Sequence, residues 1–127
     1  MAPRRLLLID DEDDIREVAK LSLELVAHWD VLTASSGAEG VRQANQHQPD
    51  AILLDFMMPG MDGAATFAQL QSNSATRNIP VVLLTAKIFD RGSDRRGLEG
   101  ITVISKPFDP MRLATQVAAA LGWTSSC

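Results

Sequence analysis

Three short runs of apolar residues, each bounded by polar or turn-forming residues, dominate the hydrophobic pattern of this chain. They lie at residues 5–10, 50–55 and 80–85. Their apolar positions are consecutive rather than alternating, which is typical of strands covered on both faces of a sheet. Two weaker runs, at residues 30–34 and 101–104, are candidates for two further strands.

Segments with helical spacing separate these runs. Residues 13–27 predict an amphipathic helix. We assign its buried stripe to Ile15, Val18, Leu21, Leu25 and Val26. Ser36 and Glu39 have the spacing of a capping box, in which Glu39 reaches back to the helix start, so a second helix is expected to run to about Gln46.

Three more helices are expected in the second half of the chain. Asp62 can cap a third helix that runs through Leu70. Residues 90–99 contain two glycines and three arginines, so we expect a short and loosely packed fourth helix there. Asp109 and Pro110 predict the N-cap and first residue of the last helix. Its buried stripe should comprise Leu113, Val117, Ala120 and Leu121.

Strand and helix therefore alternate five times along the chain. This order predicts an α/β fold, a five-stranded parallel sheet with helices on both faces. A length of 127 residues suits one domain, which we assign to residues 1–127, with a core of about 5–121 and a short polar tail at 122–127. Ligands of such sheets bind at the carboxyl ends of the strands, where the chemistry is to be sought.

The composition of the chain excludes several kinds of partner and bond. A net charge of -4 gives no positive field for a polyanion, so we expect no nucleic-acid partner. The sequence has neither an apolar run long enough to span a bilayer nor a secretory signal, so we expect no membrane partner and a cytoplasmic protein. The single cysteine, Cys127, excludes an intrachain disulfide, and His28 and His47 lack metal-ligand spacing.

Polar side chains follow the predicted strands. Asp10 and Asp11 follow the first, Asp55 and Thr85 end the third and fourth, and Lys106 follows the fifth. All should meet at one edge of the sheet, where three carboxylates repel one another unless a cation offsets their charge. Oxygen ligands suit Mg²⁺. The set also contains an ammonium, a hydroxyl and a carboxylate nucleophile, as phosphoryl transfer requires.

These motifs occur in a familiar order. The acidic pair, the run DFMMPGMDG at residues 55–63, Thr85-Ala86 and Lys106-Pro107 resemble the receiver domains of response regulators, over nearly the whole chain. The resemblance implies two-component signalling, a flavodoxin-like strand order 2-1-3-4-5, and a stand-alone phosphoacceptor rather than an enzyme. It also implies a histidine kinase or phosphotransfer protein as donor, an unknown downstream protein target, and a monomer or weak dimer.

The resemblance assigns roles to the acidic residues. Asp55 would be phosphorylated, and Mg²⁺ would be bound by Asp10, Asp11, Asp55 and the backbone carbonyl of Met57. Among these, Asp11 would be the more direct ligand of the acidic pair.

It also assigns roles on the last two strands. Lys106 would bond a phosphoryl oxygen and precede a cis peptide at Pro107, Thr85 would move toward the phosphoryl group, and Ala86 would leave room for the donor.

The chain departs from the family pattern in two places. Val103 stands where the family often has a switching Tyr or Phe, so the aromatic half of the usual switch is missing. Met57 and Lys87 stand where the family tunes the access of water. Since neither a thioether nor an ammonium can serve as a base, we expect slow hydrolysis of the phosphorylated state.

The sequence also bears on alternative functions and on the extent of the protein. A flavodoxin-like electron carrier is disfavoured because residues 10–14 are acidic and would repel a flavin phosphate. A phosphatase of the haloacid dehalogenase type would need a second acid two residues after its nucleophile, where this chain has Met57. A receiver cut from a longer regulator stays open. The arginines of residues 91–96 form either a solvated face or a docking surface for an acidic partner.

Overall fold

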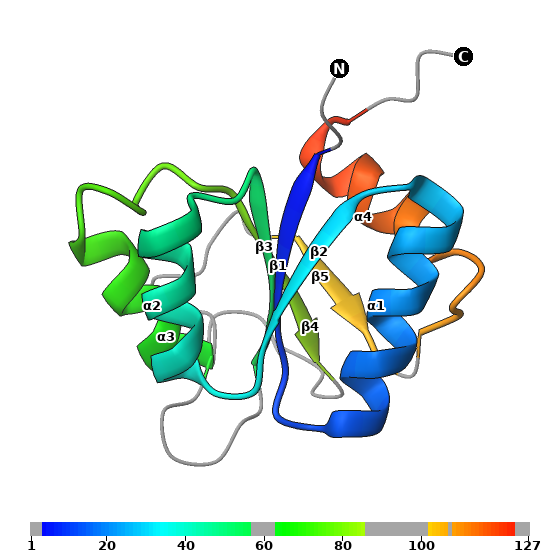
Figure 1. The fold of residues 1–127 in the computed structure, drawn as a ribbon, viewed down its shortest axis with the longest axis horizontal. Helices are drawn as coiled ribbons and strands as arrows, with labels where there is room; N and C mark the ends of the chain where they lie inside the picture. Colours follow the sequence, from blue (N-terminus) through cyan, green and yellow to red (C-terminus); the bar gives the residue numbers. More distant parts are fainter. Residues whose placement is uncertain (1–3, 57–62, 86–101, 107, 124–127) are drawn as a thin grey trace.

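A computed structural model describes residues 4–56, 63–85, 102–106 and 108–123 of the chain (Figure 1). Five strands and four helices lie within this part. They are β1 (Arg5–Ile9), α1 (Asp13–Ala27), β2 (Asp30–Ala34), α2 (Gly37–His47), β3 (Ala51–Asp55), α3 (Gly63–Ser72), β4 (Val81–Thr85), β5 (Val103–Ser105) and α4 (Leu113–Leu121).

The strands form one parallel sheet in the order β2-β1-β3-β4-β5. This is the doubly wound, flavodoxin-like arrangement implied by the resemblance to receiver domains, in which the strand order reverses between β1 and β3. The register pairs Ile9 of β1 with Leu54 of β3, and Asp55 with Leu84 of β4. The carboxyl ends of the three central strands therefore lie side by side.

Helices cover both faces of the sheet (Figure 1): α1 and α4 pack on one face, and α2 and α3 on the other. Side chains of β1 alternate between the two layers. Leu6 and Leu8 join the core under α1 and α4, whereas Leu7 and Ile9 join the core under α2 and α3. All four are fully buried, which explains the unbroken apolar run in this strand.

The bounds of α1 match the prediction, but the predicted buried stripe is wrong. Four of its five members are exposed: Val18, Leu21, Leu25 and Val26. The residues that are buried are Ala19, Ser22 and Leu23. Two of these three side chains, Ala19 and Ser22, are small. The Ser22 hydroxyl donates a hydrogen bond to the carbonyl of Pro110, in the turn before α4. A pattern counted from large apolar residues therefore selected the wrong side of the helix.

The start of α2 follows the predicted capping, with one difference. Ser36 Oγ accepts a hydrogen bond from the Glu39 backbone N–H at 3.1 Å, as expected. The Glu39 carboxylate reaches one residue further back than predicted and accepts the Ser35 backbone N–H at 2.6 Å. That hydrogen bond is the main cause of a lowered pKa for Glu39.

The last helix begins later than predicted. The N-cap of α4 is Arg112, without a side-chain cap hydrogen bond, and not Asp109 as predicted. The Asp109 carboxylate accepts the Met111 backbone N–H at 2.9 Å in the turn before the helix. Residues 110–112 form a turn, and α4 itself starts at Leu113 rather than at Pro110. Leu113 and Val117 are buried as expected.

The fifth strand differs from its predicted bounds. Strand β5 covers Val103–Ser105, shifted toward the carboxyl end from the predicted 101–104. The predicted fourth helix and the Asp62 cap lie outside the described residues. Among the residues that the structure describes, no helix is long and apolar enough to cross a membrane.

The amino-terminal edge of the sheet is closed by aromatic rings. Trp29, just before β2, and Trp123, just after α4, meet edge to face with ring centroids 5.2 Å apart. The guanidinium of Arg4 lies 4.4 Å from the Trp123 ring centroid, in cation–π geometry. Both tryptophans are partly buried and pack on the core under α1 and α4.

Gly63, the first residue of α3, lies tightly against the end of β3. Its backbone N–H donates to the Phe56 carbonyl at 2.9 Å. A Cβ at this position would lie 2.4 Å from Phe56 Cα and 3.0 Å from the Asp55 carbonyl oxygen. Only glycine lets α3 start this close to the residue that follows β3.

Two leucines of α1 test the corrected buried face. Leu23→Ala removes a fully buried side chain and should lower the free energy of unfolding by about 2–5 kcal/mol. Leu25→Ala, on the same helix, removes a side chain that is 73% exposed and should change it by less than about 0.5 kcal/mol. Urea unfolding of both variants measures the difference, and equal losses would restore the stripe predicted from the sequence.

Gly63→Ala should lower the free energy of unfolding by about 1–3 kcal/mol, because the added methyl group meets backbone rather than a movable side chain. Helix propensity alone would favour alanine by up to about 1 kcal/mol, so the predicted sign depends on the contact. Urea unfolding gives the answer. A more stable variant would mean that the segment after β3 moves aside at little cost.

Candidate functional site

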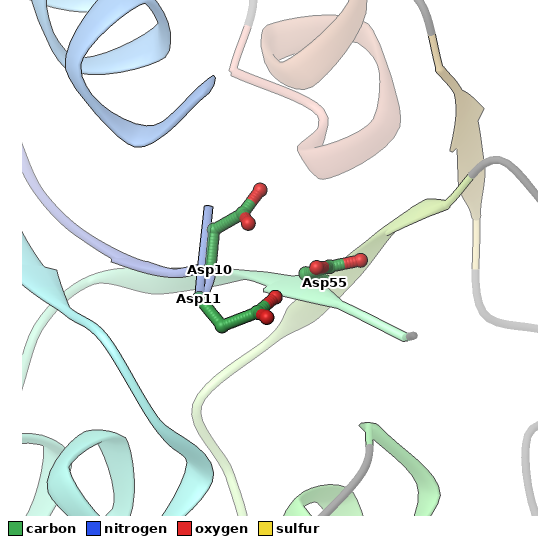
Figure 2. Close-up of side chains that lie close together, drawn as sticks. All are labelled: Asp10, Asp11 and Asp55. Carbon is green, nitrogen blue, oxygen red and sulfur yellow. The ribbon is translucent and has the colours of Figure 1, made fainter. Parts of the chain in front are cut away.

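The carboxyl edge of the sheet brings the predicted acidic residues together. Asp55 is the last residue of β3, and Asp10 directly follows β1, one position beyond the Ile9–Leu54 register pair. The Asp10 backbone N–H donates to the Ala34 carbonyl at 3.1 Å and so continues the pairing of β1 with β2. Figure 2 shows Asp10 and Asp11, from the segment after β1, beside Asp55.

The three carboxylates form a compact cluster. Each offers an oxygen, and these three atoms lie within 4.8 Å of one another. Asp10 is fully buried and Asp55 is 1% exposed, whereas Asp11 is half-buried. Buried carboxylates at such distances repel one another, so the cluster needs positive charge nearby.

Lys106 supplies positive charge from the segment after β5. Its Nζ lies 3.0 Å from Asp10 Oδ2, 3.0 Å from Glu12 Oε1 and 3.4 Å from Asp55 Oδ2. Burial of the side chain lowers its pKa, but the carboxylates of Asp10, Glu12 and Asp55 raise it more, so that the pKa of Lys106 is raised overall. The ammonium thus stays charged and offsets part of the cluster's negative charge.

Two residues at the start of α1, neither of them predicted from the sequence to belong to the site, hold the acidic loop in place. The Glu12 backbone N–H donates to Asp10 Oδ1 at 2.9 Å. The Arg16 guanidinium donates to the Asp10 carbonyl at 2.8 Å and to the Asp13 carboxylate at 2.5 Å. The helical spacing of Asp13 and Arg16 was a usable signal for that ion pair, but the contact of Glu12 with Lys106 had none.

The cluster fits a small divalent cation. Its ligand atoms are all oxygens, and the 4.8 Å limit on their separation is close to the roughly 4 Å between opposite oxygens around Mg²⁺. Within the described residues, Asp11 Oδ1 is buried and accepts no hydrogen bond, whereas the buried Asp10 Oδ2 has the Lys106 ammonium beside it at 3.0 Å. A buried carboxylate oxygen that lacks a donor, such as Asp11 Oδ1, is suited to bind a metal ion.

Of the remaining predicted site residues, the structure describes Thr85 and Val103. Thr85 ends β4 one residue beyond Leu84, the register partner of Asp55, so its backbone lies at the same edge as the cluster. Val103 is half-buried in β5 and packs on the core under α2 and α3. The other four predicted positions, Met57, Ala86, Lys87 and Pro107, lie outside the described residues.

Comparison with known proteins agrees with this site. The family model of the response regulator receiver domain matches residues 6–118. The phosphate regulon transcriptional regulatory protein PhoB of Escherichia coli is 40% identical over 121 residues, which cover 93% of this chain and 52% of PhoB. The DNA-binding dual master transcriptional regulator RpaA of Synechocystis is 38% identical over 125 residues, covering 92% of this chain and 48% of RpaA.

These relatives correct one prediction. The chain spans about half the length of the curated relatives it matches, and PhoB and RpaA are transcriptional regulators, the second named as DNA-binding. The prediction that nucleic acid is not a partner is therefore wrong. It rested on a net charge of -4, and the charge of a receiver domain carries no information about what the rest of a regulator binds.

Solved structures give the same fold. The chemotaxis protein CheY4 of Vibrio cholerae is similar over 94% of this chain and 99% of its own, with a TM-score of 0.84 and 25% identity. This structural similarity agrees with the family match, with the strand order and with the acidic cluster at the carboxyl edge of the sheet. The chain therefore belongs to the response-regulator receiver family, the signalling domains of two-component systems.

Proposed function

We propose that this receiver domain accepts a phosphoryl group on Asp55 from a histidine kinase or a histidine phosphotransfer protein, in a reaction that depends on Mg²⁺. One observation carries the proposal: three carboxylates with oxygens within 4.8 Å of one another, and an ammonium within 3.4 Å of Asp55, at the carboxyl edge of the sheet. Family membership supports it. The signal would pass on through contacts of the phosphorylated domain with another protein or another part of its own regulator.

Asp55 is the nucleophile in this proposal. One of its carboxylate oxygens forms a bond to phosphorus while the bond between phosphorus and the donor's imidazole nitrogen breaks, and the electron pair of that bond returns to the imidazole. The product is an acyl phosphate. Lys106, 3.4 Å from Asp55 Oδ2, is close enough to donate to a phosphoryl oxygen and to offset the charge that arrives. The hydroxyl of Thr85 is the proposed second donor.

Asp10, Asp11 and Asp55 would hold Mg²⁺, with the Met57 carbonyl as a further ligand by analogy with the family. Bound there, the ion would neutralise charge on the phosphoryl oxygens during transfer. Asp10 Oδ1 accepts the Glu12 backbone N–H, so Asp10 Oδ2 would be the atom toward the metal, next to the Lys106 ammonium at 3.0 Å. The Arg16 guanidinium donates a hydrogen bond to the Asp10 carbonyl. This contact would hold the backbone of the acidic pair in place when Mg²⁺ or a phosphoryl group binds.

Asp55→Asn should abolish phosphorylation, because the amide is neither a nucleophile nor a source of an acyl phosphate. Wild-type protein incubated with acetyl phosphate and Mg²⁺ should gain the mass of one phosphoryl group. Asp14→Asn is the matched control, since Asp14 is an exposed carboxylate on the first turn of α1. Intact-mass spectrometry reads all three proteins, and undiminished labelling of the Asp55→Asn variant would refute the assignment.

Asp11→Ala should weaken Mg²⁺ binding by roughly tenfold or more, the loss usual even for residues that lie behind metal ligands. Asp14→Ala, three residues along and outside the cluster, should bind Mg²⁺ as the wild type does. Titration calorimetry with the metal alone compares the three proteins. Equal affinities for wild type and Asp11→Ala would remove Asp11 from the metal site.

A further inference from the structure

Glu12 stands at the N-cap of α1 but does not cap the helix. No side-chain hydrogen bond is made at this cap. Its carboxylate instead accepts a hydrogen bond from Lys106 Nζ at 3.0 Å, between residues 94 positions apart in the sequence. Favourable placement of an acid at a helix start is thus an incomplete account of Glu12, because its side chain is turned toward the site.

Among the three carboxylates around Lys106, Glu12 differs from the other two. Its side chain is 58% exposed, whereas those of Asp10 and Asp55 are at most 1% exposed. The contact of Lys106 with Asp10 Oδ2 is an ion pair without the angles of a hydrogen bond, while Glu12 receives a directed one. The exposed carboxylate of Glu12 therefore takes a directed hydrogen bond from the ammonium, while the buried Asp10 Oδ2 keeps its 3.0 Å ion pair with the same ammonium.

We propose that Glu12 is a positioning residue that holds Lys106 in the unphosphorylated state and releases it when a phosphoryl oxygen takes its place. The proposal rests on the function proposed above. Lys106 has three donors on a rotatable ammonium, so a new acceptor on Asp55 must replace an existing one. Glu12 is the partner released at least cost, because an exposed carboxylate regains water, whereas the buried Asp10 would be left unpaired.

The exchange has a measurable consequence. A contact that must break before Lys106 engages the phosphoryl group slows phosphorylation. Ion pairs with one exposed member are worth little, so the removal of this one should speed the reaction by about threefold. If Glu12 instead held Lys106 in its working position throughout, its removal would slow the reaction.

The first test reads the contact without metal or phosphodonor. In isotope-labelled protein, the Lys106 ammonium should give a nitrogen–hydrogen correlation in the NMR spectrum, because its side chain is only 9% exposed. Glu12→Gln should shift or broaden that signal, and Asp14→Asn, which removes a charge two residues away, should leave it in place. An unchanged Lys106 signal in Glu12→Gln would overturn the proposal, and this outcome is independent of whether Asp55 is phosphorylated.

The second test measures the rate of labelling by acetyl phosphate with Mg²⁺. Glu12→Gln should label about threefold faster than wild type, and Asp14→Asn at the wild-type rate. Glu12→Asp keeps the charge but shortens the side chain by about 1.5 Å, which breaks a 3.0 Å contact, and it should also label faster. A slower or unchanged rate for Glu12→Gln, or a wild-type rate for Glu12→Asp, would overturn the exchange. Labelling that persists in Asp55→Asn would instead count against the proposed function.

Discussion

The site is a consequence of two neighbouring parallel strands that end in acids. The register of β1 and β3 brings the residues after Ile9 and Leu54 to the same place, so Asp10 and Asp55 cannot avoid each other without a shift of the whole sheet. A shift by one residue would turn every buried side chain of these strands to the opposite layer. The repulsion is therefore fixed by the hydrophobic core, and the residues around the cluster have to offset it.

This constraint explains why the surroundings of the cluster are held so firmly. Gly63 brings α3 against the residue that follows Asp55, and Arg16 ties the first turn of α1 to the Asp10 carbonyl. Both contacts restrain the backbone that carries a carboxylate. A cluster that loosened could relieve its repulsion by turning side chains to water, and it would then have nothing to offer a cation or a phosphoryl group.

The sequence pattern was sufficient for the parallel α/β architecture and for the members of the cluster, because both depend on order along the chain. The order of the strands across the sheet came from the resemblance to receiver domains. Unbroken apolar runs predicted strands covered on both faces, and the polar residues that end them predicted where charge would gather. The buried face of α1 was wrong, since Ala19 and Ser22 allow close packing that a count of large apolar residues cannot see. The contact of Glu12 with Lys106 joins loops at opposite ends of the chain, and no local pattern marks it. The exclusion of nucleic acid was wrong because it rested on net charge alone, whereas the relative RpaA is named as a DNA-binding regulator.

The aromatic pair at the far edge of the sheet has a practical meaning for optical work on this protein. The sequence has two tryptophans and no tyrosine, and both tryptophans meet at the amino-terminal edge, opposite the acidic cluster. The intrinsic tryptophan fluorescence of this protein therefore reports on a single region, where Arg4, the start of β2 and the end of α4 come together. It follows the docking of the last helix on the sheet, and events at the carboxyl edge reach it only through the length of the strands.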